Sequence, residues 1–165
     1  MCHACLVAFA LFATGGNGPI RSHNERIVRA LAEGRRSPTF RRLIERLEQS
    51  DLILYAESGT CGRPEVLSCV ALMAGAGGYR YVRITIDTTH SLQLLVSQLA
   101  HELQHAVEMA NAPNVIDTAT LRALYQRIGR DDVALDVFET RAALDTATAV
   151  IAELAGSLPN RSPDR

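Results

Sequence analysis

The sequence contains no tryptophan, and aromatic residues make up only 5% of its 165 positions. Proteins that bind single-stranded nucleic acid stack the bases on aromatic side chains, so this composition argues against such a platform. Neither sign of charge is in excess, since 17 basic and 18 acidic residues give a formal net charge of −1. Without a basic surplus, the chain has no general attraction to nucleic acid or to an anionic membrane surface. We expect neither as a partner.

The chain also lacks internal repeats and an internal linker. With 165 residues, 47% of them hydrophobic, it is long enough to bury one core and too short for two domains of ordinary size. We expect one domain over residues 21–158, preceded by a distinct N-terminal segment over 1–20 and followed by a flexible tail over 159–165.

The N-terminal segment has the pattern of a signal peptide. Its apolar run, Leu6–Ala13, has the length of a secretory core and is too short to span a bilayer, and small, turn-prone residues follow it. The residues before it include no Lys or Arg, although signal peptides usually begin with positive charge. We expect cleavage and export to the periplasm or the medium. If the segment is not a signal, the protein would be cytoplasmic.

The placement of two cysteines also favours export. Cys61 and Cys69 flank a short loop that leads into a predicted strand. A disulfide between them would close that loop in an oxidising compartment. Two unrelated thiols are the alternative that the sequence leaves open.

Hydrophobic periodicity predicts a single α+β domain with a small antiparallel sheet of about three strands and several packed helices. Helices are expected over residues 24–33, 38–49, 91–111, 118–128 and 133–154, and strands over 52–56, 66–74 and 79–87. The glycines of 75–78 predict a hairpin turn between the last two strands. The strand over 79–87 leads into the helix of 91–111, and we hypothesise that it pairs with an extended peptide.

His101, Glu102 and His105 form an H-E-x-x-H motif on that helix. Two histidines four positions apart on a helix present their imidazoles about one turn apart, where they can bind a single Zn²⁺. The glutamate between them can serve as a general base toward water at the metal. The apolar residues of the helix fall on the opposite face, which places the motif on a polar face with Gln98 and Glu108. The motif therefore predicts a zinc site.

The third metal ligand is expected to be a carboxylate, because a catalytic zinc usually has three protein ligands and no histidine follows His105. Glu139 is our candidate, because small residues follow it on the same face of a predicted helix and let two helices approach closely. The alternative is an exposed glutamate that favours the helix dipole without any metal. Asp136 is a reserve candidate, as a ligand or as the acceptor of an imidazole N–H. Glu108 is expected to hydrogen-bond around the site.

The sequence His101-Glu102-Leu103-Gln104-His105, followed by Glu139-x-x-Ala142, resembles the gluzincin group of metallopeptidases over roughly residues 79–154. The resemblance implies a zincin-like domain, zinc bound by His101, His105 and Glu139, and Glu102 as the general base. The commoner pattern has an aspartate four residues after the ligand glutamate, where this chain has Ala143.

We therefore expect a zinc-dependent peptidase that acts on a peptide or protein substrate. Glu102 would take a proton from the attacking water and deliver it to the leaving amine. The oxyanion also needs a donor, for which Tyr125 is our first candidate, because its helix lies between the two ligand-bearing segments; other candidates are Tyr81, His90 and His23. One alternative is a non-catalytic, zinc-stabilised, peptidase-like binding domain. Another is a cytoplasmic regulator with a peptidase-like module.

Overall fold

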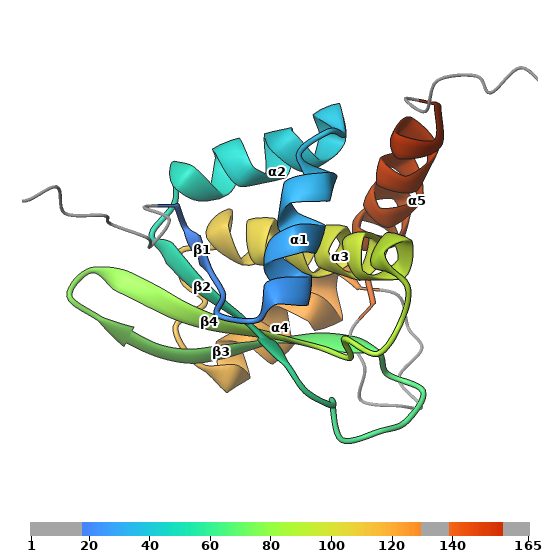
Figure 1. The fold of residues 1–165 in the computed structure, drawn as a ribbon. Coiled ribbons are helices and arrows are strands. Elements are labelled where there is room, and N and C mark those ends of the chain that lie inside the picture. Colours follow the sequence, from blue (N-terminus) through green and yellow to red (C-terminus); the bar gives the residue numbers. More distant parts are fainter. Residues whose placement is uncertain (1–17, 130–138, 157–165) are drawn as a thin grey trace, which may run out of the picture.

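The computed structural model describes residues 18–129 and 139–156, which form five helices and a four-stranded sheet (Figure 1). The predicted α+β class is confirmed. The elements in chain order are β1 (Ile20–Arg21), α1 (Glu25–Gly34), α2 (Pro38–Glu48), β2 (Leu52–Ser58), β3 (Ser68–Ala76), β4 (Tyr79–Ile86), α3 (Leu92–Ala110), α4 (Thr118–Ile128) and α5 (Arg141–Gly156). Residues 1–17, 130–138 and 157–165 lie outside the described residues, and Asp136 is among them.

The first four helices begin where a capping side chain precedes them, and Asn24 caps α1. Ser37 caps α2 just before Pro38, Ser91 caps α3 and Asp117 caps α4. In each case the side-chain oxygen accepts a hydrogen bond from a backbone N–H of the first turn, which would otherwise lack a partner. These starts were predictable because the signal is local.

The hairpin between β3 and β4 turns on Gly77 and Gly78, whose φ angles are 60° and 82°. Two consecutive residues with positive φ are typical of the tight turn that matches the twist of antiparallel strands, and glycine adopts this conformation without steric cost. The predicted hairpin is therefore confirmed.

The sheet is mixed, with the strand order β1-β2-β4-β3. β1 and β2 are parallel, β2 and β4 are parallel, and only β3 and β4 are antiparallel. The expected antiparallel sheet of about three strands is therefore wrong in both strand number and direction. After the hairpin, β4 is inserted between β3 and β2 and pairs with β2 in parallel. Hydrophobic periodicity along the chain carries no information on which strands become neighbours. β1 has only two residues, too few for a recognisable pattern.

The hypothesis that the strand over 79–87 pairs with a peptide is also wrong. β4 is hydrogen-bonded to β2 on one side and to β3 on the other, so its backbone has no free edge. The edge strand beside β4 is β3. Any strand addition on this side of the sheet would therefore use Ser68–Ala76.

α3 lies at the centre of the fold, in contact with α1, α2 and α5 and with strands β3 and β4 (Figure 1). Its apolar face is buried as predicted, but Gln98, Glu102 and His105 on the other face are buried as well. The helix is thus enclosed nearly all round. The motif does not face open solvent because α5 and β3 cover that side of the helix.

Arg80, at the start of β4, holds the end of α3 from inside the protein. Its guanidinium donates to the carbonyl oxygens of Met109, Ala112 and Val115 at 2.9–3.0 Å and makes two hydrogen bonds of 2.7 Å to the Asp51 carboxylate. Arg80 is only 5% exposed. The carbonyls of Met109 and Ala112 also accept from backbone N–H groups, so the arginine adds a second donor to both and links the end of α3 to the segment that follows it.

The sheet includes a residue that precedes position 21, the expected start of the domain. Ile20 pairs with Leu54 in the sheet, and the Pro19 carbonyl accepts a hydrogen bond from the Leu54 N–H. Within residues 18–129 and 139–156, no helix has both the length and the apolar character needed to cross a bilayer.

Candidate metal centre

His101 and His105 lie on successive turns of α3, with their Nε2 atoms 3.2 Å apart. Their rings meet edge to face, with centroids 4.8 Å apart. The spacing of four residues on a regular helix produces this approach, as the sequence predicted. Two imidazole nitrogens this close share either one proton or one metal ion, so the third neighbour decides between these interpretations.

That third neighbour is Glu139. Its Oε1 lies 3.4 Å from Nε2 of His101 and 3.8 Å from Nε2 of His105. A tetrahedral zinc with bonds of 2.0–2.1 Å separates its ligand atoms by about 3.3 Å. The three side chains therefore fit one shared ion without a change of backbone. They are also the one group of histidine, cysteine and acidic ligands within reach of a common metal in the described part of the chain.

Glu139 is not on a helix, contrary to our expectation of a helix from about residue 133. α5 begins at Arg141, and Thr140 caps it: the Thr140 Oγ1 accepts from the Ala143 N–H at 3.1 Å. Glu139 therefore precedes the cap, and the Thr140 N–H donates to its Oε1 at 2.8 Å. A threonine at the cap stops the helix from extending backwards, because its side chain takes up a backbone donor of the first turn.

The predicted small-residue face is buried in part. Ala143 and Val150 are buried in the packing of α5 on the rest of the protein, whereas Ala142 is exposed. α5 packs closely on α3, so the expectation of two adjacent segments was correct.

Glu108 supports His105 from behind. The His105 Nδ1–H donates to Glu108 Oε2 at 2.9 Å, and the Thr140 hydroxyl donates to Glu108 Oε1 at 2.7 Å. A hydrogen bond at Nδ1 leaves the lone pair of Nε2 directed at the site, which is the tautomer that a metal requires. Glu108 thus has the supporting role predicted for it. Sequence reasoning missed Thr140, although a threonine just ahead of an alanine-rich helix is a recognisable capping signal.

The electrostatics differ between the two histidines. Burial, together with the neighbouring His105, lowers the pKa of His101 to about 4, so this imidazole is neutral at pH 7. Burial would also lower the pKa of His105, but its hydrogen bond to Glu108 and the nearby carboxylates outweigh burial and raise the pKa. The same contact with His105 offsets burial and lowers the pKa of Glu108. The carboxylates of Glu102, Glu108 and Glu139 thus favour positive charge on His105 and not on His101.

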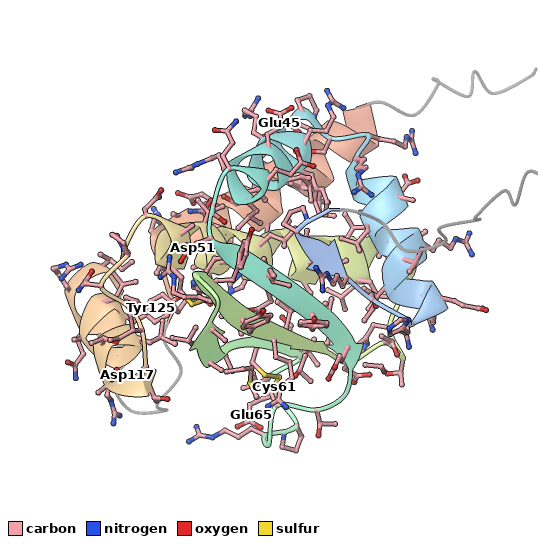
Figure 2. All side chains as sticks on the ribbon, turned by 90° about the vertical axis from the view of Figure 1, so that its left-hand side faces the viewer. Glu45, Asp51, Cys61, Glu65, Asp117 and Tyr125 are labelled. Carbon is pink, nitrogen blue, oxygen red and sulfur yellow. A yellow bond between two sulfur atoms is a disulfide. The ribbon has the colours of Figure 1, made fainter. Side chains whose placement is uncertain are left out.

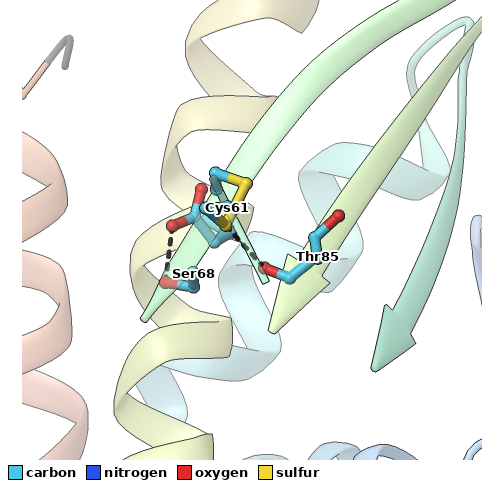
Figure 3. The surroundings of a disulfide bond; sticks show 5 residues. Cys61, Ser68 and Thr85 are labelled. Carbon is cyan, nitrogen blue, oxygen red and sulfur yellow. Dashed lines mark hydrogen bonds between the residues drawn. A yellow bond between two sulfur atoms is a disulfide. The ribbon is translucent and has the colours of Figure 1, made fainter. Parts of the chain in front are cut away.

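Glu102 is 3% exposed and lies beside this group on α3. Burial raises its pKa to about 7, although the nearby His105 and a hydrogen bond from Ser68 oppose the shift. The Ser68 hydroxyl donates to Oε1 of Glu102 at 2.7 Å (Figure 3). A carboxyl group that titrates near neutral pH can both accept and release a proton, as a general base that becomes a general acid must.

A cavity of about 950 Å³ opens beside the three ligands and Glu102. One wall is the loop between Cys61 and Cys69, which are joined by a disulfide, and this loop lies at one end of the sheet (Figure 2). The start of β3, Glu139 and the helices α3, α4 and α5 supply the rest. Gln98 also lines the cavity and is 7% exposed, and neither polar atom of its amide has a hydrogen-bond partner among the described residues.

Tyr125 extends from α4 toward α3 (Figure 2). Its hydroxyl donates to the backbone carbonyl of His105 at 3.3 Å, and its ring meets the His105 ring edge to face at 5.3 Å. Burial raises the pKa of the hydroxyl. These contacts hold His105 in place. A role for Tyr125 as oxyanion donor stays a prediction.

Comparisons of the chain with protein-family models, with curated proteins and with solved structures found no match. The functional argument therefore depends on the motif residues and on the geometry described above.

Proposed function

We propose that this protein is a zinc-dependent peptidase of the kind that the gluzincin resemblance implies. The observation that carries the proposal is the approach of His101 Nε2, His105 Nε2 and Glu139 Oε1, which lie within 4.8 Å of one another. Two imidazoles and one carboxylate form a ligand set that zinc hydrolases use, with a fourth position left for water or substrate. His101 is neutral at pH 7, so its Nε2 lone pair can bind a metal, and the hydrogen bond from Nδ1 of His105 to Glu108 directs Nε2 of His105 toward the same position.

His101, His105 and Glu139 would hold the zinc, which when bound would lower the pKa of water and polarise a peptide carbonyl. Glu102 is the general base: its carboxylate takes the proton of the attacking water and later gives it to the leaving amine. Its burial excludes competing solvent, and its position one residue after His101 brings the carboxylate to the cavity. Glu108 and Thr140 keep His105 oriented throughout.

The substrate would bind along β3. This strand is an edge of the sheet, and Ser68, Cys69 and Val70 line the cavity. An extended peptide can add to such an edge through main-chain hydrogen bonds and so bring one peptide bond to the ligand group. The Cys61–Cys69 disulfide fits an oxidising compartment, and we propose export on that basis.

The decisive experiment is to measure zinc content and peptide hydrolysis on purified protein and three variants. Glu102→Gln should retain stoichiometric zinc and lose hydrolysis of a peptide library by at least about 100-fold. Glu139→Ala should lose zinc and activity together. Glu45→Gln, on the solvent face of α2 (Figure 2), is the matched control and should behave as wild type.

Wild-type protein without stoichiometric zinc would refute the proposal. Bound zinc without hydrolysis by wild type would favour the non-catalytic binding domain instead. Activity that persists in Glu102→Gln would show that the hydrolysis arises at another site or from a contaminant.

A further inference from the structure

Ser68 contacts the proposed general base from a different part of the chain. It is the first residue of β3, and its hydroxyl donates to Oε1 of Glu102 at 2.7 Å, across 34 positions of sequence (Figure 3). The motif places Glu102 on the correct helix, but it does not determine how the carboxylate is rotated. The terminal torsion of a glutamate is broad, so an external contact is needed to select one orientation.

We infer that Ser68 is a positioning residue for Glu102. The inference rests on the proposed peptidase function. By occupying Oε1, the hydroxyl of Ser68 leaves Oε2 to take the proton of the attacking water. The bond also prevents the carboxylate from turning away from the cavity that both residues line. Reacting groups held in one geometry avoid the entropic cost of finding it, which is where a positioning residue acts.

The fold gives Ser68 little freedom to move. Its backbone pairs with Ile86 of β4, and the carbonyl of the preceding Leu67 accepts from the Asp87 N–H at 2.8 Å. The next residue, Cys69, is joined to Cys61, whose sulfur lies 3.8 Å from the carbonyl oxygen of Thr85 (Figure 3). Sheet pairing on one side and the disulfide on the other thus fix the hydroxyl against α3.

A purely structural role predicts a different outcome. If Ser68 served only to satisfy a buried carboxylate, its loss would reduce the stability of the protein and disturb the site as a whole. If Ser68 orients the base, its loss should reduce kcat while KM, zinc affinity and stability stay close to those of wild type. The change in kcat, compared with the changes in KM, zinc affinity and stability, distinguishes the two roles.

The test compares Ser68→Ala, Ser68→Thr and Ser58→Ala in the zinc-loaded protein. Ser68→Ala should lower kcat about 10- to 100-fold, with KM changed less than about twofold. Ser68→Thr keeps a hydroxyl and should restore most of the rate. Ser58, in β2 of the same sheet, is a matched control, since its hydroxyl makes a 2.7 Å hydrogen bond to Thr88 and it does not line the cavity.

A crystal structure of each variant supplies a readout that needs no activity. The Glu102 carboxylate should occupy one orientation in wild type and Ser68→Thr, and several in Ser68→Ala. An unchanged kcat, or a loss of rate accompanied by zinc loss or by a similar change in KM, would overturn the inference. So would a single, unchanged carboxylate orientation in Ser68→Ala. If wild type does not hydrolyse peptides, the proposed function fails, and the crystallographic comparison still decides whether Ser68 orients Glu102.

Discussion

The Thr140 hydroxyl donates a 2.7 Å hydrogen bond to Glu108, and through it the segment that carries Glu139 is tied to the helix that carries the two histidines. The other oxygen of Glu108 accepts from Nδ1 of His105 at 2.9 Å. The same threonine caps α5. One side chain therefore starts a helix, positions the residue before it and supports a candidate ligand on another helix.

Loss of the Glu108 carboxylate should weaken metal binding. Glu108→Ala removes the acceptor at Nδ1 of His105, and residues in this supporting position typically contribute 10- to 100-fold to metal affinity. We expect a loss of zinc affinity within about that range, measured by competition with a chromophoric chelator. Thr140→Val should have a smaller effect in the same direction, and Thr140→Ser, which keeps the hydroxyl, should bind zinc as wild type does. Wild-type affinity in Glu108→Ala would contradict the assignment.

The disulfide should contribute to stability through the unfolded chain. Cys61 and Cys69 are eight positions apart, and closing so short a loop is expected to add about 2–3 kcal/mol to the free energy of unfolding. The double variant Cys61→Ala/Cys69→Ala should be destabilised by about that amount in urea denaturation. Reduction of wild type with a dithiol should lower its stability to that of the double variant, and should leave the double variant itself unchanged. Insensitivity of wild type to complete reduction would count against this account.

The pair formed by Arg80 and Asp51 should make stability depend on acid pH. The hydrogen bond from Arg80 is the main reason that the pKa of Asp51 falls below its ordinary value of 3.8. A carboxylate with a lowered pKa in the folded state stabilises the protein fully above the unfolded pKa, and this contribution is lost as pH falls through the folded pKa. Since the Asp51 side chain is 41% exposed, Asp51→Asn should cost only about 1 kcal/mol at pH 7. The difference from wild type should shrink below about pH 4.

Arg80 should contribute more to the free energy of unfolding than Asp51 does. Arg80→Met keeps an apolar stem but leaves three buried carbonyls at the end of α3 without this donor. We expect a loss of about 3 kcal/mol or more in the free energy of unfolding. A larger effect for Asp51→Asn than for Arg80→Met would contradict this order.

Gln98 offers a test of buried polarity beside the cavity. Because its amide has no partner among the described residues, Gln98→Met, which has a similar shape, should raise the free energy of unfolding by about 1 kcal/mol. Gln104 is the matched control, since its amide contacts Glu108 and Thr146 at 3.5 Å. Gln104→Met should not stabilise the protein. Destabilisation by Gln98→Met would show that the amide is satisfied in solution.

The structural predictions were accurate where a feature depends on residues that are close in the sequence. The starts of α2, α3 and α4 and the turn at Gly77 and Gly78 depend on capping side chains and φ angles within a few residues. Glu139 and Thr140 were wrongly placed in a helix because apolar residues also precede them in the sequence, and the capping preference of Thr140 was overlooked.

The sequence by itself determined the local chemistry: two imidazoles on one helix face with a carboxylate between them, because four residues make about one helical turn. Only the tertiary structure decided that β4 lies between β2 and β3, that Glu139 reaches both histidines, and that Ser68 contacts Glu102. These contacts join residues from tens of positions apart. They depend on which buried surfaces pack together, and hydrophobic spacing along the chain does not contain that information.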